Sequence, residues 1–216
     1  MLNSPDYTRT CHCPYQNQTS LALIHMPWMA YWTNSNYTWN GNPIQNLGLN
    51  FNAPGDRSSP DEVLWFEYPP VSGIPPGIDI RLDTAGFRKI RKEPFMVVSE
   101  KTPWVSASGL EGIRSLEVTL TKATPAVDQE FTVKLYFAEL DNLRPGERVF
   151  NISLQGKEVY RHFDIAGVSG KPDREIVLTF HGIKAGKTLK LELTPTQGNT
   201  LISGMELIRE TDSATP

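Results

Sequence analysis

The stretch that decides the fold reads FTVKLYFAEL at residues 131–140 and, after a polar turn, RVFNISL at residues 148–154. In both segments large apolar residues alternate with polar ones, which predicts strands that bury one face. The same alternation recurs in LEVTL at 116–120, IVLTF at 176–180 and LKLEL at 189–193. Glycine and proline turns separate these runs at the spacing of a β-sandwich, and no segment sustains a helical period. The sequence therefore predicts an all-β antiparallel sandwich.

Composition and charge limit the kinds of binding partner and cellular location that the protein can have. The chain has 216 residues, a formal net charge of −3, 39% hydrophobic and 21% charged residues, enough apolar material for a folded core. Its one dense basic run, residues 88–92, is interpreted as a solvated strand end, which argues against nucleic acid as the main partner. No stretch approaches the roughly 20 apolar residues of a membrane span. Residues 1–10 also lack the apolar centre of a signal peptide. We expect either a cytoplasmic protein or the C-terminal part of a longer exported chain.

The chain divides into two parts that differ in amino-acid composition. Residues 1–43 are rich in Asn, Tyr, Thr and Trp and end in the turn-forming stretch Asn-Gly-Asn-Pro at 40–43. The strand-like runs then occupy residues 44–210, and residues 211–216 read as a disordered C-terminus. We predict an extended or irregular N-terminal segment followed by one sandwich domain.

The only cysteines, Cys11 and Cys13, flank His12. A bond between residues i and i+2 is sterically awkward, and two thiols with one imidazole fall short of the four ligands of a structural zinc site. Two interpretations stay open. The thiols are either reduced or buried, or one of them pairs with a cysteine outside this chain.

Catalytic patterns are weak. The sequence contains no Gly-x-Ser-x-Gly motif, no histidine spacing typical of a metal site and no phosphate-binding loop. Glu139 and Asp141 would share one face of a strand, an arrangement that suits a calcium or sugar contact as well as acid–base chemistry. Ser108 is the remaining candidate nucleophile. We expect a protein that is not an enzyme and that holds neither a metal nor a cofactor.

Sugar binding has better support. Sugar rings present apolar C–H faces fringed by hydroxyls, so an aromatic platform with nearby amides or carboxylates recognises both. Candidate platforms such as Trp104 and Tyr136 lie in or beside predicted strands and loops, although a single Trp or Tyr is more often a packing residue of the core or its rim than a ligand platform. The polar candidates lie near strand ends and are Glu139, Asp141, Asn142, Gln197 and Asn199.

Three ordered blocks resemble the malectin and malectin-like domains: FTVKLYFAE at 131–139, GERVFNISLQG at 146–156 and HFDI at 162–165. The strands expected at 47–51 and 201–206 extend the resemblance over residues 44–210. It implies a jelly-roll-like, galactose-binding-like β-sandwich that binds an oligo- or polysaccharide in a cleft built by loops at one end.

The sequence also departs from the family's pattern at two sites that bind sugar in the family. The aromatic pair that follows the Phe-Ala-Glu strand in the family is replaced by Asp141 and Asn142, and no acid stands near residues 196–199 where the family has an aspartate. Trp104 is the residue that could correspond to a further aromatic contact. Glu139 and Arg148 form either a strand-end ion pair or, in the case of Glu139, part of the ligand site.

The segment PDYTRTCHCPYQNQTSLAL at residues 5–23 resembles the C-terminal end of bacterial pyrroloquinoline-quinone-like β-propeller proteins. This resemblance implies a larger bacterial chain that is periplasmic, envelope-bound or secreted, in which Cys11 or Cys13 pairs with an upstream cysteine. Any quinone site would lie in the upstream propeller. Two functions follow as hypotheses: a non-catalytic carbohydrate-binding module, or a structural domain that packs on the propeller without binding sugar.

Overall fold

The computed structural model describes residues 31–32, 39–53, 55–59, 61, 63–70 and 77–210. Cys11, Cys13 and the propeller-like segment at 5–23 lie outside the described residues, as do residues 211–216. The strands from β2 onward fall between residues 46 and 209, inside the range expected for the sandwich. The domain boundaries themselves stay a prediction.

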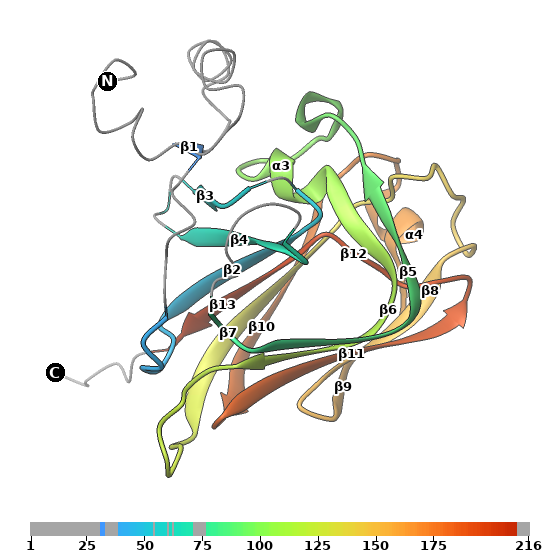
Figure 1. Cartoon of the computed structure of the whole chain (residues 1–216). Helices are drawn as coiled ribbons and strands as arrows, with labels where there is room; N and C mark the ends of the chain where they lie inside the picture. The colour runs from blue at the N-terminus through green and yellow to red at the C-terminus, as the bar shows by residue number, and fades with distance from the viewer. Residues whose placement is uncertain are drawn as a thin grey trace, which may run out of the picture.

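The described chain forms two sheets packed face to face (Figure 1). The seven-stranded sheet has the order β1-β3-β4-β2-β13-β7-β10, and the six-stranded sheet has the order β12-β6-β11-β8-β9 with β5 paired to β6. The strands are β1 (Tyr31–Trp32), β2 (Asn46–Phe51), β3 (Arg57–Ser58), β4 (Leu64–Tyr68), β5 (Ile80–Arg91), β6 (Ser108–Thr119), β7 (Gln129–Phe137), β8 (Val149–Leu154), β9 (Lys157–Asp164), β10 (Ile176–Ala185), β11 (Thr188–Gln197), β12 (Leu201–Ile202) and β13 (Gly204–Arg209). The short helices are η1 (Pro94–Met96), α3 (Pro103–Ser106) and α4 (Ile165–Ser169).

Strand pairing is antiparallel throughout the named strands except between β2 and β4, which run parallel. The predicted all-β sandwich is therefore confirmed. Strand β1 pairs with β3 through Tyr31 and Ser58, so residues 31–32 of the N-terminal segment join the edge of the seven-stranded sheet.

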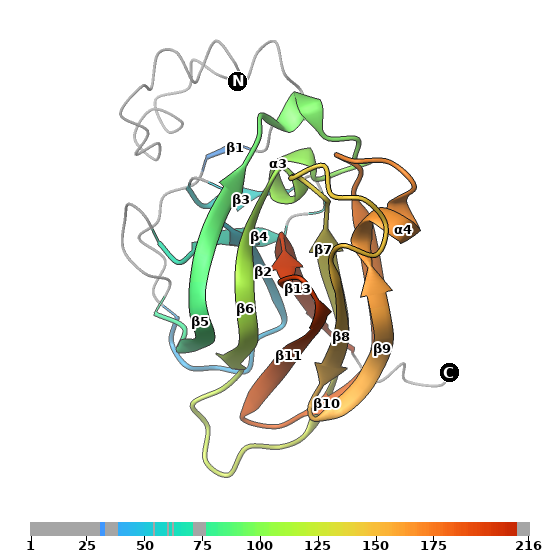
Figure 2. The same ribbon diagram turned by 90° about the vertical axis from the view of Figure 1, so that its right-hand side faces the viewer.

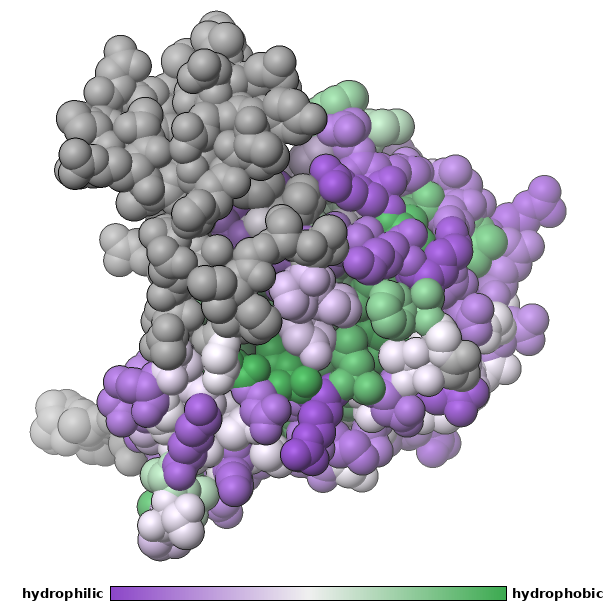
Figure 3. Space-filling view, viewed as in Figure 1, coloured by the Kyte–Doolittle hydropathy of each residue, from purple (hydrophilic) through white to green (hydrophobic). Residues whose placement is uncertain are grey.

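The core lies between the two sheets, where the alternation read from the sequence directs its apolar side chains. In β7, Phe131, Val133, Leu135 and Phe137 are each at most 1% exposed. The Phe137 ring lies 4.8 Å from that of Phe163 in β9, centroid to centroid, across the sandwich. In the view of Figure 3, apolar surface gathers in the region between the sheets and hydrophilic residues surround it.

Loops and bulges gather at the upper end of the sandwich. The loop from β7 to β8 and helix α4 lie there, together with α3 and the loop that follows β5 (Figure 2). Because sheet strands hold the bases of these loops in place, this end can present side chains from distant parts of the sequence at fixed positions.

Candidate functional site

Three backbone segments meet at the upper end of the six-stranded sheet. The β5–β6 register shifts between Thr84 and Arg88, so the residues between them bulge out opposite Gly112. The Gly112 amide donates to the Thr200 carbonyl at 2.9 Å, which ties this bulge to the turn after β11. A Cβ at Gly198, where φ is +63°, would lie 2.4 Å from the Glu147 carbonyl oxygen, so this turn packs directly on the β7–β8 loop. Glycine is required there because the backbone is left-handed and the approach is close.

A buried guanidinium organises the charges at this end. The Arg148 side chain is 1% exposed, and its Nε donates to Glu139 at 2.9 Å while Nη2 donates to Asp141 at 2.9 Å. A third carboxylate, that of Glu111, lies 3.4 Å from Arg148 Nη1, as an ion pair without a hydrogen bond. Glu139 is fully buried. Of the two roles left open for Glu139, the structure shows the ion pair.

Arg88 adds a solvent-facing layer to the same cluster. Its Nε donates to Glu111 at 2.6 Å, and its terminal nitrogens pair with Asp141. The bond to Asp141 raises the pKa of the Arg88 guanidinium above its ordinary value, so Arg88 stays charged. Two guanidiniums thus hold three carboxylates in place. We call Arg88, Glu111, Glu139, Asp141 and Arg148 the ionic cluster.

The polar residues expected from the sequence surround this cluster. Asn199 donates its side-chain amide to Glu111 at 3.2 Å, Gln197 is exposed at the end of β11, and Asn142 is exposed in a left-handed turn beside Asp141. Five of the seven predicted residues therefore share one end of the sandwich. The arrangement offers carboxylate and amide acceptors next to guanidinium and amide donors, the groups that recognise sugar hydroxyls.

Sequence reasoning missed Arg88 and Glu111, and also Phe87, an exposed aromatic residue directly before Arg88 in β5. The Phe87 side chain is 42% exposed at the tip of the β5 bulge, directly before Arg88. The signal available in the sequence was the pair Gly86 and Gly112, which take positive φ values on facing strands. Glycines inside strand patterns mark bulges.

Trp104 and Tyr136 lie in a different place, where α3, which contains Trp104, packs on the outer face of the seven-stranded sheet, to which Tyr136 of β7 belongs. They are 2% and 7% exposed, and Trp65 packs edge-on against both, with centroid distances of 5.6 and 5.2 Å. The Tyr136 hydroxyl donates to Glu206 at 2.7 Å, and burial together with that carboxylate raises the tyrosine pKa. These two rings act as packing groups in this structure and are not brought together with the ionic cluster.

The candidate catalytic groups have structural partners. Ser108 is buried and its hydroxyl donates to the Val105 carbonyl at 3.2 Å, while Glu139 and Asp141 both bind Arg148. Within the described residues, no group of three or more His, Cys, Asp or Glu side chains is arranged to hold a metal ion. None of the helices in the described part of the chain has the length and apolar character that a membrane crossing requires.

Comparison with known proteins agrees with this architecture. Residues 114–208 match the family model described as the malectin domain, a range that begins inside β6 and ends in β13. Among solved structures, the chain is similar to Bacteroides uniformis beta-glucuronidase 2 covalently bound to cyclophellitol-6-carboxylate aziridine (15% identity, TM-score 0.58, 77% of this chain and 18% of that chain). It is also similar to two Arabidopsis thaliana structures. For the ANXUR2 extracellular domain the identity is 14% and the TM-score 0.58, with 79% of this chain and 49% of that chain covered. For the ANX2 ectodomain the identity is 15% and the TM-score 0.56, with 77% of this chain and 50% of that chain covered.

These likenesses show a shared sandwich fold. Because all three sequence identities are low, they show the fold alone. The chain spans 18% of the glucuronidase chain and about half of each plant ectodomain. A search of curated proteins finds no match.

Proposed function

We propose that this chain is a non-catalytic carbohydrate-binding module that takes its ligand at the loop end of the six-stranded sheet. The observation that carries the proposal is the ionic cluster at the loop end, with the exposed Phe87 next to Arg88 in β5. The malectin match over residues 114–208 supports it, since malectin domains are binding modules rather than enzymes.

The geometry suits recognition of a neutral sugar. One face of the sugar ring would lie on Phe87, whose side chain is 42% exposed. Hydroxyl groups would donate to the free lone pairs of Asp141 and Glu111 and accept from Asn199 and Arg88. Because the buried Arg148 already fixes these carboxylates, the protein would lose little side-chain freedom on binding.

The proposal extends to the context of the module. We infer that it is an appendage of a larger exported bacterial protein, positioned to hold that protein near a glycan. Two observations support this context: the solved structures that share the fold are longer chains, and two of them are extracellular domains. The resemblance of residues 5–23 to the end of a quinoprotein-like propeller supports an upstream domain of that type.

A glycan array probed with the full chain tests the module directly. We expect binding to a defined set of oligosaccharides that is lost in Phe87→Ala and retained in Phe95→Ala. Phe95 is the matched control because it is 69% exposed on η1, outside the ionic cluster. An array without hits, or equal losses in both variants, would contradict the proposal.

A second candidate function, packing on the upstream domain without sugar binding, is favoured by one surface. Phe95, Met96 and Val98 are 69%, 49% and 62% exposed on the loop after β5, and three large apolar side chains within four residues are unusual on a free surface. Figure 3 shows apolar residues at the upper tip, where Figure 1 places this loop. Oxidative footprinting distinguishes the candidates, because docking would protect Phe95 and Met96 in the full-length protein relative to this chain alone.

A further inference from the structure

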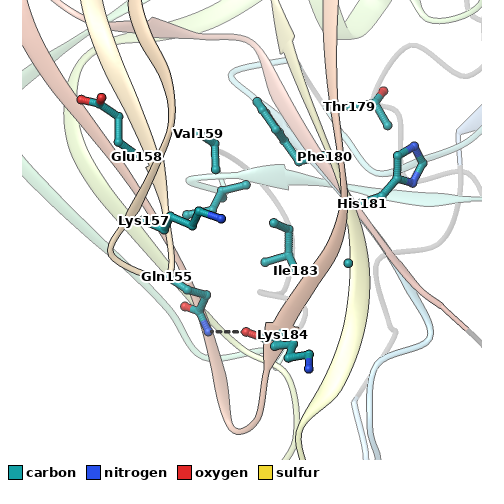
Figure 4. A pocket seen from close by; sticks show the side chains of 11 residues that line it. Gln155, Lys157, Glu158, Val159, Thr179, Phe180, His181, Ile183 and Lys184 are labelled. Carbon is teal, nitrogen blue, oxygen red and sulfur yellow. Dashed lines mark hydrogen bonds between the residues drawn. The ribbon is translucent and has the colours of Figure 1, made fainter.

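A cavity opens far from the ionic cluster, between the outermost strands of the two sheets. Strand β9 ends the six-stranded sheet and β10 ends the seven-stranded sheet, and neither pairs with another named strand on its outer side. Between them lies an open groove of about 660 Å³ (Figure 4). This volume falls within the range of small-ligand sites. We call it the edge groove.

The edge groove has an apolar floor and a polar rim. Val159, Phe180 and Ile183 are half-buried and point into it (Figure 4). Gln155 closes one end, since its side-chain amide donates to the carbonyls of Lys184 at 3.3 Å and Thr188 at 3.1 Å. A half-buried aromatic ring on the floor, with amide and charged groups along the rim, is a combination that suits sugar rings.

Both edges are built against pairing with an additional β-strand. The β10 register shifts between Phe180 and Ile183, where Gly182 has a φ of +65°, and the β8–β9 register shifts near His162, whose φ is +53°. Bulges and exposed lysines interrupt the row of backbone groups that an incoming strand requires. A ligand that binds through side chains therefore fits the groove better than a peptide strand.

The charge of the rim selects among such ligands. Lys184 pairs with Glu130 at 3.7 Å and Glu158 pairs with Arg161 at 2.8 Å, whereas Lys157 forms no ion pair with any described residue. Figure 4 shows the Lys157 side chain directed toward the groove. We propose that the edge groove binds an acidic oligosaccharide, with a sugar ring on Phe180 and a sugar carboxylate on the Lys157 ammonium.

This proposal is independent of the loop-end site and is tested by titrating the full ¹⁵N-labelled chain with an oligogalacturonide and with a cello-oligosaccharide of equal length. We expect amide shifts at residues 154–159 and 179–184 with the acidic probe only. Removing an exposed ion pair costs up to about 1 kcal/mol, so Lys157→Gln should weaken binding about fivefold. Lys157→Glu should weaken it further, and Lys89→Gln, on the opposite edge strand β5, should leave it unchanged.

Several results would overturn the proposal. Unchanged affinity in Lys157→Glu would show that Lys157 does not bind the sugar carboxylate. Equal binding of the neutral probe would show that the groove does not select acidic sugars. Shifts confined to the loop end would place the ligand elsewhere. A concentration-dependent dimer that protects residues 179–184 would show that a second copy of the chain occupies the groove. Since Phe87→Ala leaves the edge groove intact, a failure of the loop-end site would appear separately.

Discussion

Removing the buried guanidinium at the centre of the ionic cluster should be one of the most damaging single changes to this protein. Arg148 is 1% exposed and lies against Glu139, which is fully buried. In Arg148→Met the Glu139 carboxylate would lose its counter-charge without gaining water. Breaking a buried pair in this way typically costs about 3–5 kcal/mol. We expect the free energy of unfolding in urea to fall by about that amount at pH 7.

The matched control is Arg161→Met. Arg161 donates to Glu158 at 2.8 Å with the same donor atom type, but the two side chains are 70% and 37% exposed. Water replaces such a pair at a cost below about 1 kcal/mol. The double variant Arg148→Met/Glu139→Gln should lose no more stability than Arg148→Met alone, because the stranded charge is gone. Equal costs for Arg148→Met and Arg161→Met, or additive losses in the double variant, would refute the reasoning.

Three further changes follow from the structure. Tyr136→Phe removes a 2.7 Å hydrogen bond to the buried Glu206 and should lower the free energy of unfolding by about 1–3 kcal/mol. Because the folded protein raises the Tyr136 pKa, the stability of the parent chain should also fall as the pH rises above the ordinary tyrosine value near 10. Urea unfolding followed against pH should show a smaller loss in the variant. Gly198→Ala should weaken glycan binding and lower the melting temperature together, because its Cβ would lie 2.4 Å from the Glu147 carbonyl oxygen. Trp104→Ala should lower the unfolding free energy by about 3–5 kcal/mol through a cavity, as measured by urea unfolding, and any folded fraction should keep its glycan affinity.

The sandwich itself could be predicted because its strands have one buried, apolar face and one face that is more exposed and more polar. Phe131, Val133 and Phe137 must all point to the same side of β7, and the structure places them in the core. Alternation of this kind depends only on local geometry and on the cost of exposing apolar surface. The match to the malectin domain model over residues 114–208 covers the same region.

The candidate site was harder to predict because its residues come from several strands. Asp141, Asn142 and Asn199 were found as polar groups near strand ends. Arg88 and Glu111 were not, because they meet only after the β5 register shifts by a bulge. Such a shift depends on pairing between strands rather than on either strand alone.

Trp104 and Tyr136 show the converse difficulty. Tyr136 alternates away from the main core, so the pattern alone places it on an outer face where a sugar platform would be plausible. In the structure α3 and Trp65 cover that face and form a second, smaller apolar cluster. Whether an outward aromatic is bare or covered depends on a helix whose position the local sequence does not encode.

The most direct test of the central claim is to map the bound glycan. An oligosaccharide selected on the array would be titrated into the ¹⁵N-labelled full chain and the amide shifts assigned. The loop-end site predicts shifts at residues 85–88, 111–112, 141–142 and 197–199, around Phe87 and the ionic cluster. Shifts confined to other surfaces, or a selected glycan that moves none of these amides, would contradict it.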